Sequence, residues 1–156
     1  MLSALLSGKT CAECRNCCVF EEQSAWEVPT FSAEAIARLP EDSSCQVQAD
    51  GKRFRIILPY DGTHTAKKCP FLNDSTGCTL MAEEKPFACK LWPIRLMRDE
   101  TGAVFPALYN GCPGIPAEKT EAVCALLNSG LLARALQEAE RDPSLILPYH
   151  GNYVRL

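Results

Sequence analysis

Four cysteines stand within eight residues near the start of this 156-residue chain. They are Cys11, Cys14, Cys17 and Cys18, and the whole chain holds ten cysteines. A hydrophobic core does not need sulfur at this density, whereas a metal centre does, because thiolates ligate zinc and the irons of iron–sulfur clusters. The run therefore predicts a metal centre that the rest of the chain completes and covers.

The C-x2-C-x2-C spacing of Cys11, Cys14 and Cys17 suits an iron–sulfur cubane, in which each thiolate ligates a different iron. Bacterial ferredoxins combine this run with a further Cys that is followed by Pro. The chain has two such Cys-Pro pairs, at 69–70 and 112–113. In ferredoxins that fourth Cys is local, whereas here it would be distant in the sequence.

Zinc explains the same residues differently, because it takes four ligands in a tetrahedron, usually two from each of two knuckles. Cys11 with Cys14, or Cys14 with Cys17, could form one knuckle. The remote ligands would come from cysteines that form no C-x2-C pair, namely Cys69, Cys78, Cys89 and Cys112. The iron–sulfur interpretation is therefore favoured, and zinc stays the alternative.

The adjacent pair Cys17 and Cys18 is a separate question. Neighbouring side chains diverge in an extended chain, so one metal rarely takes both. Either the two thiols serve different sites, or one of them is a spare or reactive thiol.

Composition narrows the class of protein. The net charge of −3 and the pI of about 5.4 argue against a general nucleic-acid binder, which would carry a basic face.

No stretch approaches the roughly 20 apolar residues of a membrane helix, and residues 1–9 do not resemble a secretory leader. We therefore expect a cytoplasmic protein, with no membrane partner, whose thiols stay reduced. Its partner would be an unknown redox protein or small molecule.

Hydrophobic patterns and turn residues predict a single α+β domain over 1–156. Two β-hairpins are expected, at 45–58 around Asp50-Gly51 and at 94–108. A short helix is expected over 33–39 and a helical segment over 117–142 with a break at 128–130. The remaining expectations are extended segments at 25–31 and 145–156.

Four ordered motifs resemble the YkgJ-type cysteine-cluster family, which is described as a zinc- or iron-chelating domain. They are C-x2-C-x2-C-C at 11–18, CPFL at 69–72, GCTL at 77–80 and KPFACKLWP at 85–93. The resemblance covers about residues 11–113. Lys85 and Lys90 stand where the family often has Arg, and Trp92 stands where Phe or Tyr is frequent, so charge and aromaticity are kept.

The resemblance implies metal chelation by eight motif cysteines, which are Cys11, Cys14, Cys17, Cys18, Cys69, Cys78, Cys89 and Cys112. Our first choice for a [4Fe–4S] quartet is Cys11, Cys14, Cys17 and Cys69, with Cys18, Cys78, Cys89 and Cys112 as a second site. Cys45 and Cys124 fall outside the motif and are interpreted as core or spare thiols.

The resemblance says less about activity. Members are often described as iron–sulfur oxidoreductases, and a longer relative, a flagellin lysine methylase, keeps methyl transfer open. We expect an iron–sulfur protein with a redox or protein-modification role. The alternatives are a zinc-stabilised interaction module without catalysis and a metal storage or delivery protein. No catalytic residue can be assigned from the sequence.

Overall fold

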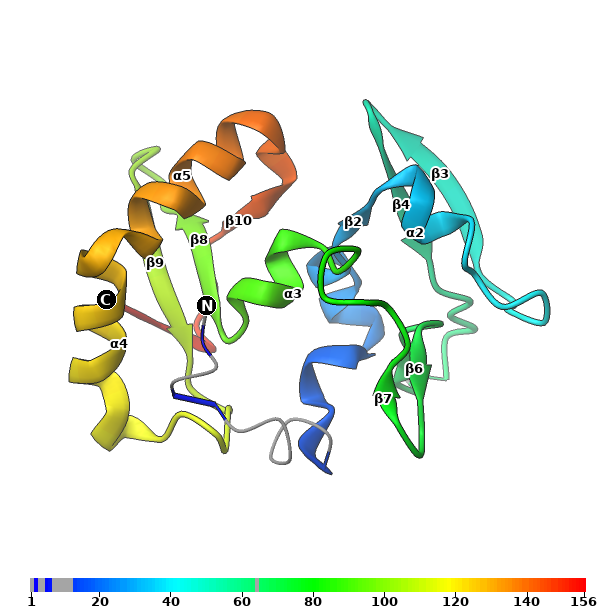
Figure 1. Cartoon of the computed structure of the whole chain (residues 1–156), viewed down its shortest axis with the longest axis horizontal. Helices are drawn as coiled ribbons and strands as arrows, with labels where there is room; N and C mark the ends of the chain where they lie inside the picture. Colours follow the sequence, from blue (N-terminus) through cyan, green and yellow to red (C-terminus); the bar gives the residue numbers. More distant parts are fainter. Residues whose placement is uncertain (1, 3–4, 7–12, 64) are drawn as a thin grey trace. The chain divides into compact units, whose positions relative to one another are not determined.

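The computed structural model describes residues 2, 5–6, 13–63 and 65–156 (Figure 1). The chain forms two compact units, which we call the central unit (Arg15–Cys89) and the terminal unit (Met1–Cys14 with Lys90–Leu156). About 33% of the chain is helix and 25% is strand, in several small sheets, which confirms the α+β class. Within the described residues, no helix has both the length and the apolar character needed to cross a bilayer.

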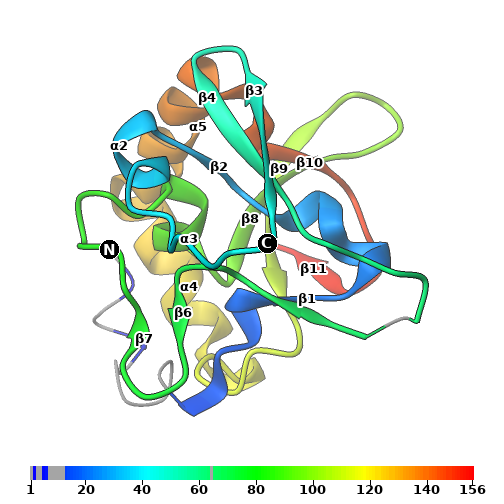
Figure 2. The same cartoon turned by 90° about the vertical axis from the view of Figure 1, so that its right-hand side faces the viewer.

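The main sheet of the central unit is a three-stranded antiparallel sheet in the order β2-β4-β3 (Figure 2). Strands β3 (Gln46–Asp50) and β4 (Arg53–Ile57) form the first predicted hairpin. Gly51 occupies the turn with φ +61°, a left-handed conformation that glycine adopts without steric cost. Strand β2 (Thr30–Phe31) pairs with β4.

The other elements of the central unit are short. They are η1 (Asn16–Cys18), β1 (Val19–Phe20), η2 (Glu22–Glu27), α2 (Ala33–Ile36), β5 (Lys67–Lys68), β6 (Leu72–Asn73) and β7 (Gly77–Cys78). Helix α3 (Phe87–Leu91) begins in this unit and ends in the terminal unit. Ser32 caps α2 as its sequence predicts, because its side chain accepts the Ala35 N–H.

The expectation that 25–31 is extended is wrong for its first part. Residues 22–27 form the 3₁₀ helix η2, because Ser24 and Glu21 cap its start: the Glu21 N–H donates to Ser24 Oγ over 3.1 Å. Trp26 adds a hydrogen bond from its indole N–H to the Gln23 carbonyl, at 2.8 Å. Only Thr30–Phe31 is a strand.

One apolar cluster, which we call the central core, holds the central unit together. Its buried members are Phe20, Val28, Phe31, Ala35, Ile56, Leu58, Phe71 and Leu80. Phe31 and Phe71 are each 1% exposed and lie with ring centroids 5.2 Å apart. Three half-buried cysteines, Cys45, Cys69 and Cys78, pack against this cluster, so the central core helps to fix the position of their side chains.

The terminal unit contains a four-stranded sheet in the order β10-β8-β9-β11. Strands β8 (Ile94–Arg98) and β9 (Val104–Tyr109) form the second predicted hairpin. The segment expected to be extended at 145–156 supplies both outer strands: β10 (Ile146–Pro148) runs parallel to β8, and β11 (Tyr153–Arg155) runs antiparallel to β9.

A helical segment runs alongside this sheet (Figure 1). It consists of η3 (Ala117–Lys119), α4 (Thr120–Leu126), the π-helical turn η4 (Leu127–Leu131) and α5 (Leu132–Arg141), followed by η5 (Pro143–Leu145). Val123, Leu127 and Leu131 are buried, as their helical spacing predicts. The predicted break is also present, because Gly130 has φ +113° inside η4.

Gly130 offers a direct test of this break. A Cβ added at Gly130 would meet nothing within 4 Å, so the only cost of Gly130→Ala is its left-handed φ. We expect the variant to lose about 1–2 kcal/mol of unfolding free energy, measured by urea denaturation. Gly151→Ala is the control, since Gly151 has the same open space and no positive φ. Equal stabilities for the two variants would show that η4 tolerates a helical backbone at 130.

Candidate metal centre

The 3₁₀ turn η1 fixes the second half of the first cysteine motif. Arg15 precedes it in a left-handed conformation with φ 53°, and the Cys18 N–H donates to the Arg15 carbonyl over 2.9 Å. This tight turn places Cys17 Sγ 3.7 Å from Cys18 Sγ. The two neighbouring thiols therefore lie side by side, because they stand on a helical turn and not in an extended chain.

A two-stranded antiparallel ladder joins this motif to the next cysteine. Strand β1 pairs with β5, with Val19 opposite Lys68 and Phe20 opposite Lys67. Directly beyond the ladder, the Cys69 N–H donates to the Cys18 carbonyl over 2.8 Å. Residues about fifty apart in the sequence are thereby held side by side at the point where both carry thiols.

An ion-pair group connects the same motif to the β6–β7 hairpin. Arg15 pairs with Asp74 through Nη1 to Oδ1 at 3.3 Å, and its Nη2 also donates to the Asp74 carbonyl. Lys68 Nζ lies 2.7 Å from the same carboxylate, and this hydrogen bond lowers the pKa of Asp74. Asp74 is exposed, so solvent screens both pairs and their contribution to stability is small. The group positions the loop rather than holding the fold together.

Two further motif cysteines lie in the central unit. Cys78 pairs with Leu72 in the β6–β7 ladder and packs, like Cys69, against the central core. Cys89 is exposed on α3, where its N–H donates to the Pro86 carbonyl over 3.0 Å. The charge of Cys89 contributes to the raised pKa of Cys18, so this thiol is within electrostatic reach of the first motif.

The crowding of these thiols changes their acidity. The pKa of Cys18 is raised strongly, first by its hydrogen bond with Cys17, then by burial, and then by the charges of Cys17, Cys69 and Cys89. The pKa of Cys69 is raised to about 12, chiefly by burial and also by the charges of Cys78, Cys17 and Cys45, while a backbone hydrogen bond with Phe71 acts to lower it. Both thiols are therefore protonated at neutral pH when no metal is bound.

The two units divide the predicted ligands between them. Cys17, Cys18, Cys69, Cys78 and Cys89 lie in the central unit, whereas Cys14, which is exposed, and Cys112, which is half-buried, lie in the terminal unit. Cys11 lies outside the described residues. The quartet of Cys11, Cys14, Cys17 and Cys69 and the second site that includes Cys112 therefore stay predictions.

Cys45, which the sequence indicates to be a core or spare thiol, packs against the same central core as Cys69. Its charge contributes to the raised pKa of Cys69. No motif marks this position. The only sequence signal is that Cys45 directly precedes a hairpin strand whose partner strand leads into the core at Leu58.

The donor set fits a thiophilic metal better than a hard cation. The grouped side chains are thiols, which suit zinc, iron and iron–sulfur clusters, whereas magnesium and calcium prefer oxygen ligands. Among the residues that the structure describes, no three Cys, His, Asp or Glu side chains converge closely enough to hold a metal ion. The thiols are thus gathered around the central core without forming a closed cage.

A family model described as "CxxCxxCC: Putative zinc- or iron-chelating domain" matches residues 10–113. The matched segment contains all eight motif cysteines and the whole central unit. No curated protein and no solved structure matches the chain.

The raised pKa values predict a steep pH dependence of metal binding. Cys18 and Cys69 must each release a proton to become ligands, so the apparent affinity rises with pH throughout the range below their raised pKa values. Between pH 6 and 8 we expect about a 100-fold gain in Zn²⁺ affinity per pH unit, ten-fold for each proton. Competition titrations against a chromophoric chelator measure this slope. A slope near zero would mean that neither thiol is a ligand.

Proposed function

This chain belongs to the CxxCxxCC family of zinc- or iron-chelating domains, and from that premise we propose that it is an iron–sulfur protein with a redox or protein-modification role. Zinc or iron chelation is the property that the family gives it, and the cysteine ligands are our proposal. The iron–sulfur centre, the redox role and the cytoplasmic location are our proposals.

The pairing of β1 with β5 is the observation that carries the proposal. It brings the C-x2-C-x2-C-C motif to Cys69, which is followed by Pro70 as in the ferredoxin motif. The charge of Cys17 contributes to the raised pKa of Cys69, which supports our assignment of these two members of the first-choice quartet to one centre. Cys11 and Cys14 are the other two members that the motif predicts.

When bound, an iron–sulfur cluster supplies one-electron transfer. The residues of this chain would set its surroundings. Burial of Cys69 and the fixed ring of Pro70 limit the access of water to the ligand sulfurs. The partner would then be a redox protein or small molecule that reaches the more exposed thiols, and a cytoplasmic location would keep unliganded thiols reduced.

A zinc-stabilised module is the second candidate, and one distance favours it. Two Zn–S bonds of about 2.3 Å at a tetrahedral angle place their sulfurs about 3.8 Å apart. The separation of 3.7 Å between Cys17 Sγ and Cys18 Sγ fits two thiolates on one tetrahedral ion. In a cubane each thiolate ligates a different iron, so there the two cysteines would have to serve different sites.

Anaerobic purification followed by metal analysis separates the two candidates. We expect a brown protein that contains iron and acid-labile sulfide and whose broad visible absorption bleaches on reduction. A colourless protein with stoichiometric zinc that resists reductant would contradict the iron–sulfur proposal and establish the second candidate.

Single substitutions identify the fourth ligand of the first cluster. We expect Cys69→Ser to reduce bound iron at least ten-fold, because losing a ligand costs no less than losing one of its supporting hydrogen bonds. Cys112→Ser should retain the first cluster, and Cys124→Ser, outside the motif, is the matched control. The visible spectrum and iron content of each purified variant give the answer. If Cys69→Ser keeps its cluster and Cys112→Ser loses it, the fourth ligand of the first cluster is Cys112 and not Cys69.

A further inference from the structure

Strand β3 forms one edge of the three-stranded sheet in the central unit, on the outer side of β4 (Figure 1). All of its residues, from Gln46 to Asp50, are exposed, and Val47 keeps 42% of its surface accessible. An edge strand presents a row of N–H and C=O groups to which a further strand can pair. The exposure of β3 therefore raises the question of which strand pairs with it.

The register of the β3–β4 hairpin fixes which backbone groups face outward. Asp50 lies opposite Arg53 across the tight turn, so this pair exchanges its backbone hydrogen bonds within the hairpin, as does every second pair after it. Every second residue of β3, counted back from Asp50, therefore turns its backbone groups toward β4. The residues between them, Val47 and Ala49, direct their N–H and C=O groups to the free edge.

Strand β3 lacks the protection that the other edge strands of the two larger sheets have. Native proteins protect such edges with Pro or Lys, or with a segment that covers them. Strand β2 is buried, and β10 ends in Pro148, which has no N–H. In β11 the Tyr153 N–H donates to the His150 carbonyl and the Tyr153 carbonyl accepts from the Tyr149 hydroxyl, each at 3.1 Å. Strand β3 contains neither Pro nor Lys, so its edge is open.

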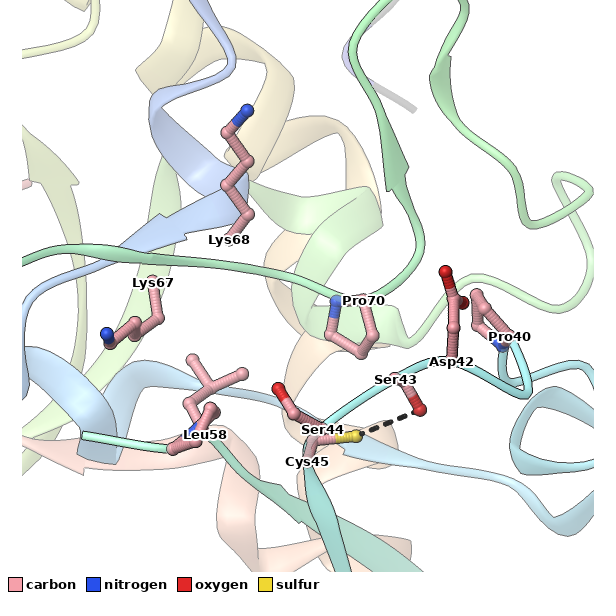
Figure 3. Close-up of a pocket in the computed structure, with 10 residues that line it drawn as sticks. Pro40, Asp42, Ser43, Ser44, Cys45, Leu58, Lys67, Lys68 and Pro70 are labelled. Atoms are coloured by element: carbon pink, nitrogen blue, oxygen red, sulfur yellow. Dashed lines mark hydrogen bonds between the residues drawn. The ribbon is translucent and has the colours of Figure 1, made fainter. Parts of the chain in front are cut away.

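The loop that leads into β3 packs at the start of the strand and not along its edge. Ser43 and Cys45 line a cavity of about 260 Å³ together with Leu58, Lys67 and Pro70, among other residues (Figure 3). The Cys45 Sγ lies 3.6 Å from the Ser43 Oγ within this loop. Among the residues that the structure describes, none from β3 belongs to the lining of the cavity. The loop therefore leaves the free edge accessible.

The sequence of β3 suits pairing with a second copy of itself. In an antiparallel pair centred on Gln48, Val47 lies opposite Ala49 of the second copy, so the two residues with outward backbone groups exchange their hydrogen bonds. The small Ala49 side chain leaves room for Val47. Gln46 then lies opposite Asp50 of the second copy, which puts an amide donor against a carboxylate. No like charges face each other in this register, whereas like charges directly opposite would be destabilising.

We propose that the free edge of β3 is an interface between two copies of this chain, in which the two β3 strands pair antiparallel around Gln48 and join the two sheets into one. Stable specific interfaces bury about 1,200–2,000 Å² in total, and a strand pair of this length contributes less. The dimer is therefore reversible and depends on concentration. This inference goes beyond the proposed function and does not require a bound metal.

Loss of an outward N–H tests the pairing. The full chain, purified anaerobically with its own metal, is measured by sedimentation equilibrium from micromolar to near-millimolar concentration, and we expect a monomer–dimer equilibrium. Val47→Pro removes an N–H that faces the free edge and keeps the hydrogen bonds to β4, so we expect the dimer dissociation constant to rise at least ten-fold. Val47→Thr keeps the N–H and nearly the same shape, and it should dimerise like the wild type.

Charge variants at one position test the register. Asp50 pairs with Arg55 of its own chain at 2.9 Å, yet its side chain is 45% exposed and can accept from a second cation. We expect Gln46→Lys, which would face Asp50 of the second copy, to lower the dissociation constant about five-fold, and Gln46→Glu to raise it about five-fold. Gln137→Lys and Gln137→Glu change the net charge equally at an exposed position on α5, and both should dimerise like the wild type.

Three results would overturn the proposal. A wild-type protein that stays monomeric at every concentration would exclude self-pairing and leave the edge to an extended segment of a different protein. A dimer that Val47→Pro and Val47→Thr affect equally would lie on another surface. Equal responses to Gln46→Lys and Gln46→Glu would exclude the antiparallel register around Gln48. Because the metal content of each variant is measured separately, none of these results bears on the proposed metal centre.

Discussion

The pairing of two very short strands is the constraint on which the thiol cluster depends. Strands β1 and β5 contribute two residues each, and the hydrogen bond from the Cys69 N–H to the Cys18 carbonyl extends their ladder to the cysteines themselves. A two-residue ladder is marginal in water on its own. Here Phe20 from β1 is buried in the central core, and the Tyr60 hydroxyl donates to the Phe20 carbonyl at 3.1 Å. Core packing therefore maintains the backbone pairing, and the pairing positions the thiols.

The gathering of thiols has an electrostatic consequence that differs from ordinary core packing. Half-buried sulfurs are compatible with the central core while they are protonated, and the raised pKa values of Cys18 and Cys69 keep them so. Converting several of them to thiolates without a counter-charge would be unfavourable, because desolvation and mutual repulsion act in the same direction. The fold is thus stable with neutral thiols, and only a thiophilic cation makes the ionised form favourable.

The sequence allowed the hairpins to be predicted because their signals are local. Asp50-Gly51 marks the β3–β4 turn, and the spacing of Val123, Leu127 and Leu131 marks the helical face. The β1–β5 ladder could not be predicted in this way, since two residues show no periodicity. The cysteine motifs identified the family and its eight thiols, but not their division between two units. That division follows from the chain path, which leaves the terminal unit after Cys14 and returns to it at Lys90.

The exposure of the thiols differs along the site, since Cys89 is exposed whereas Cys69 is half-buried against the central core. For a metal held between such ligands, exchange would proceed from one side. Water and competing ligands would reach the enclosed thiolates last, so these thiolates would be released slowly. An incoming chelator would displace the exposed thiolate first. The exposed end of such a site would therefore set how soon exchange begins, and the enclosed end would set how long the ion stays bound.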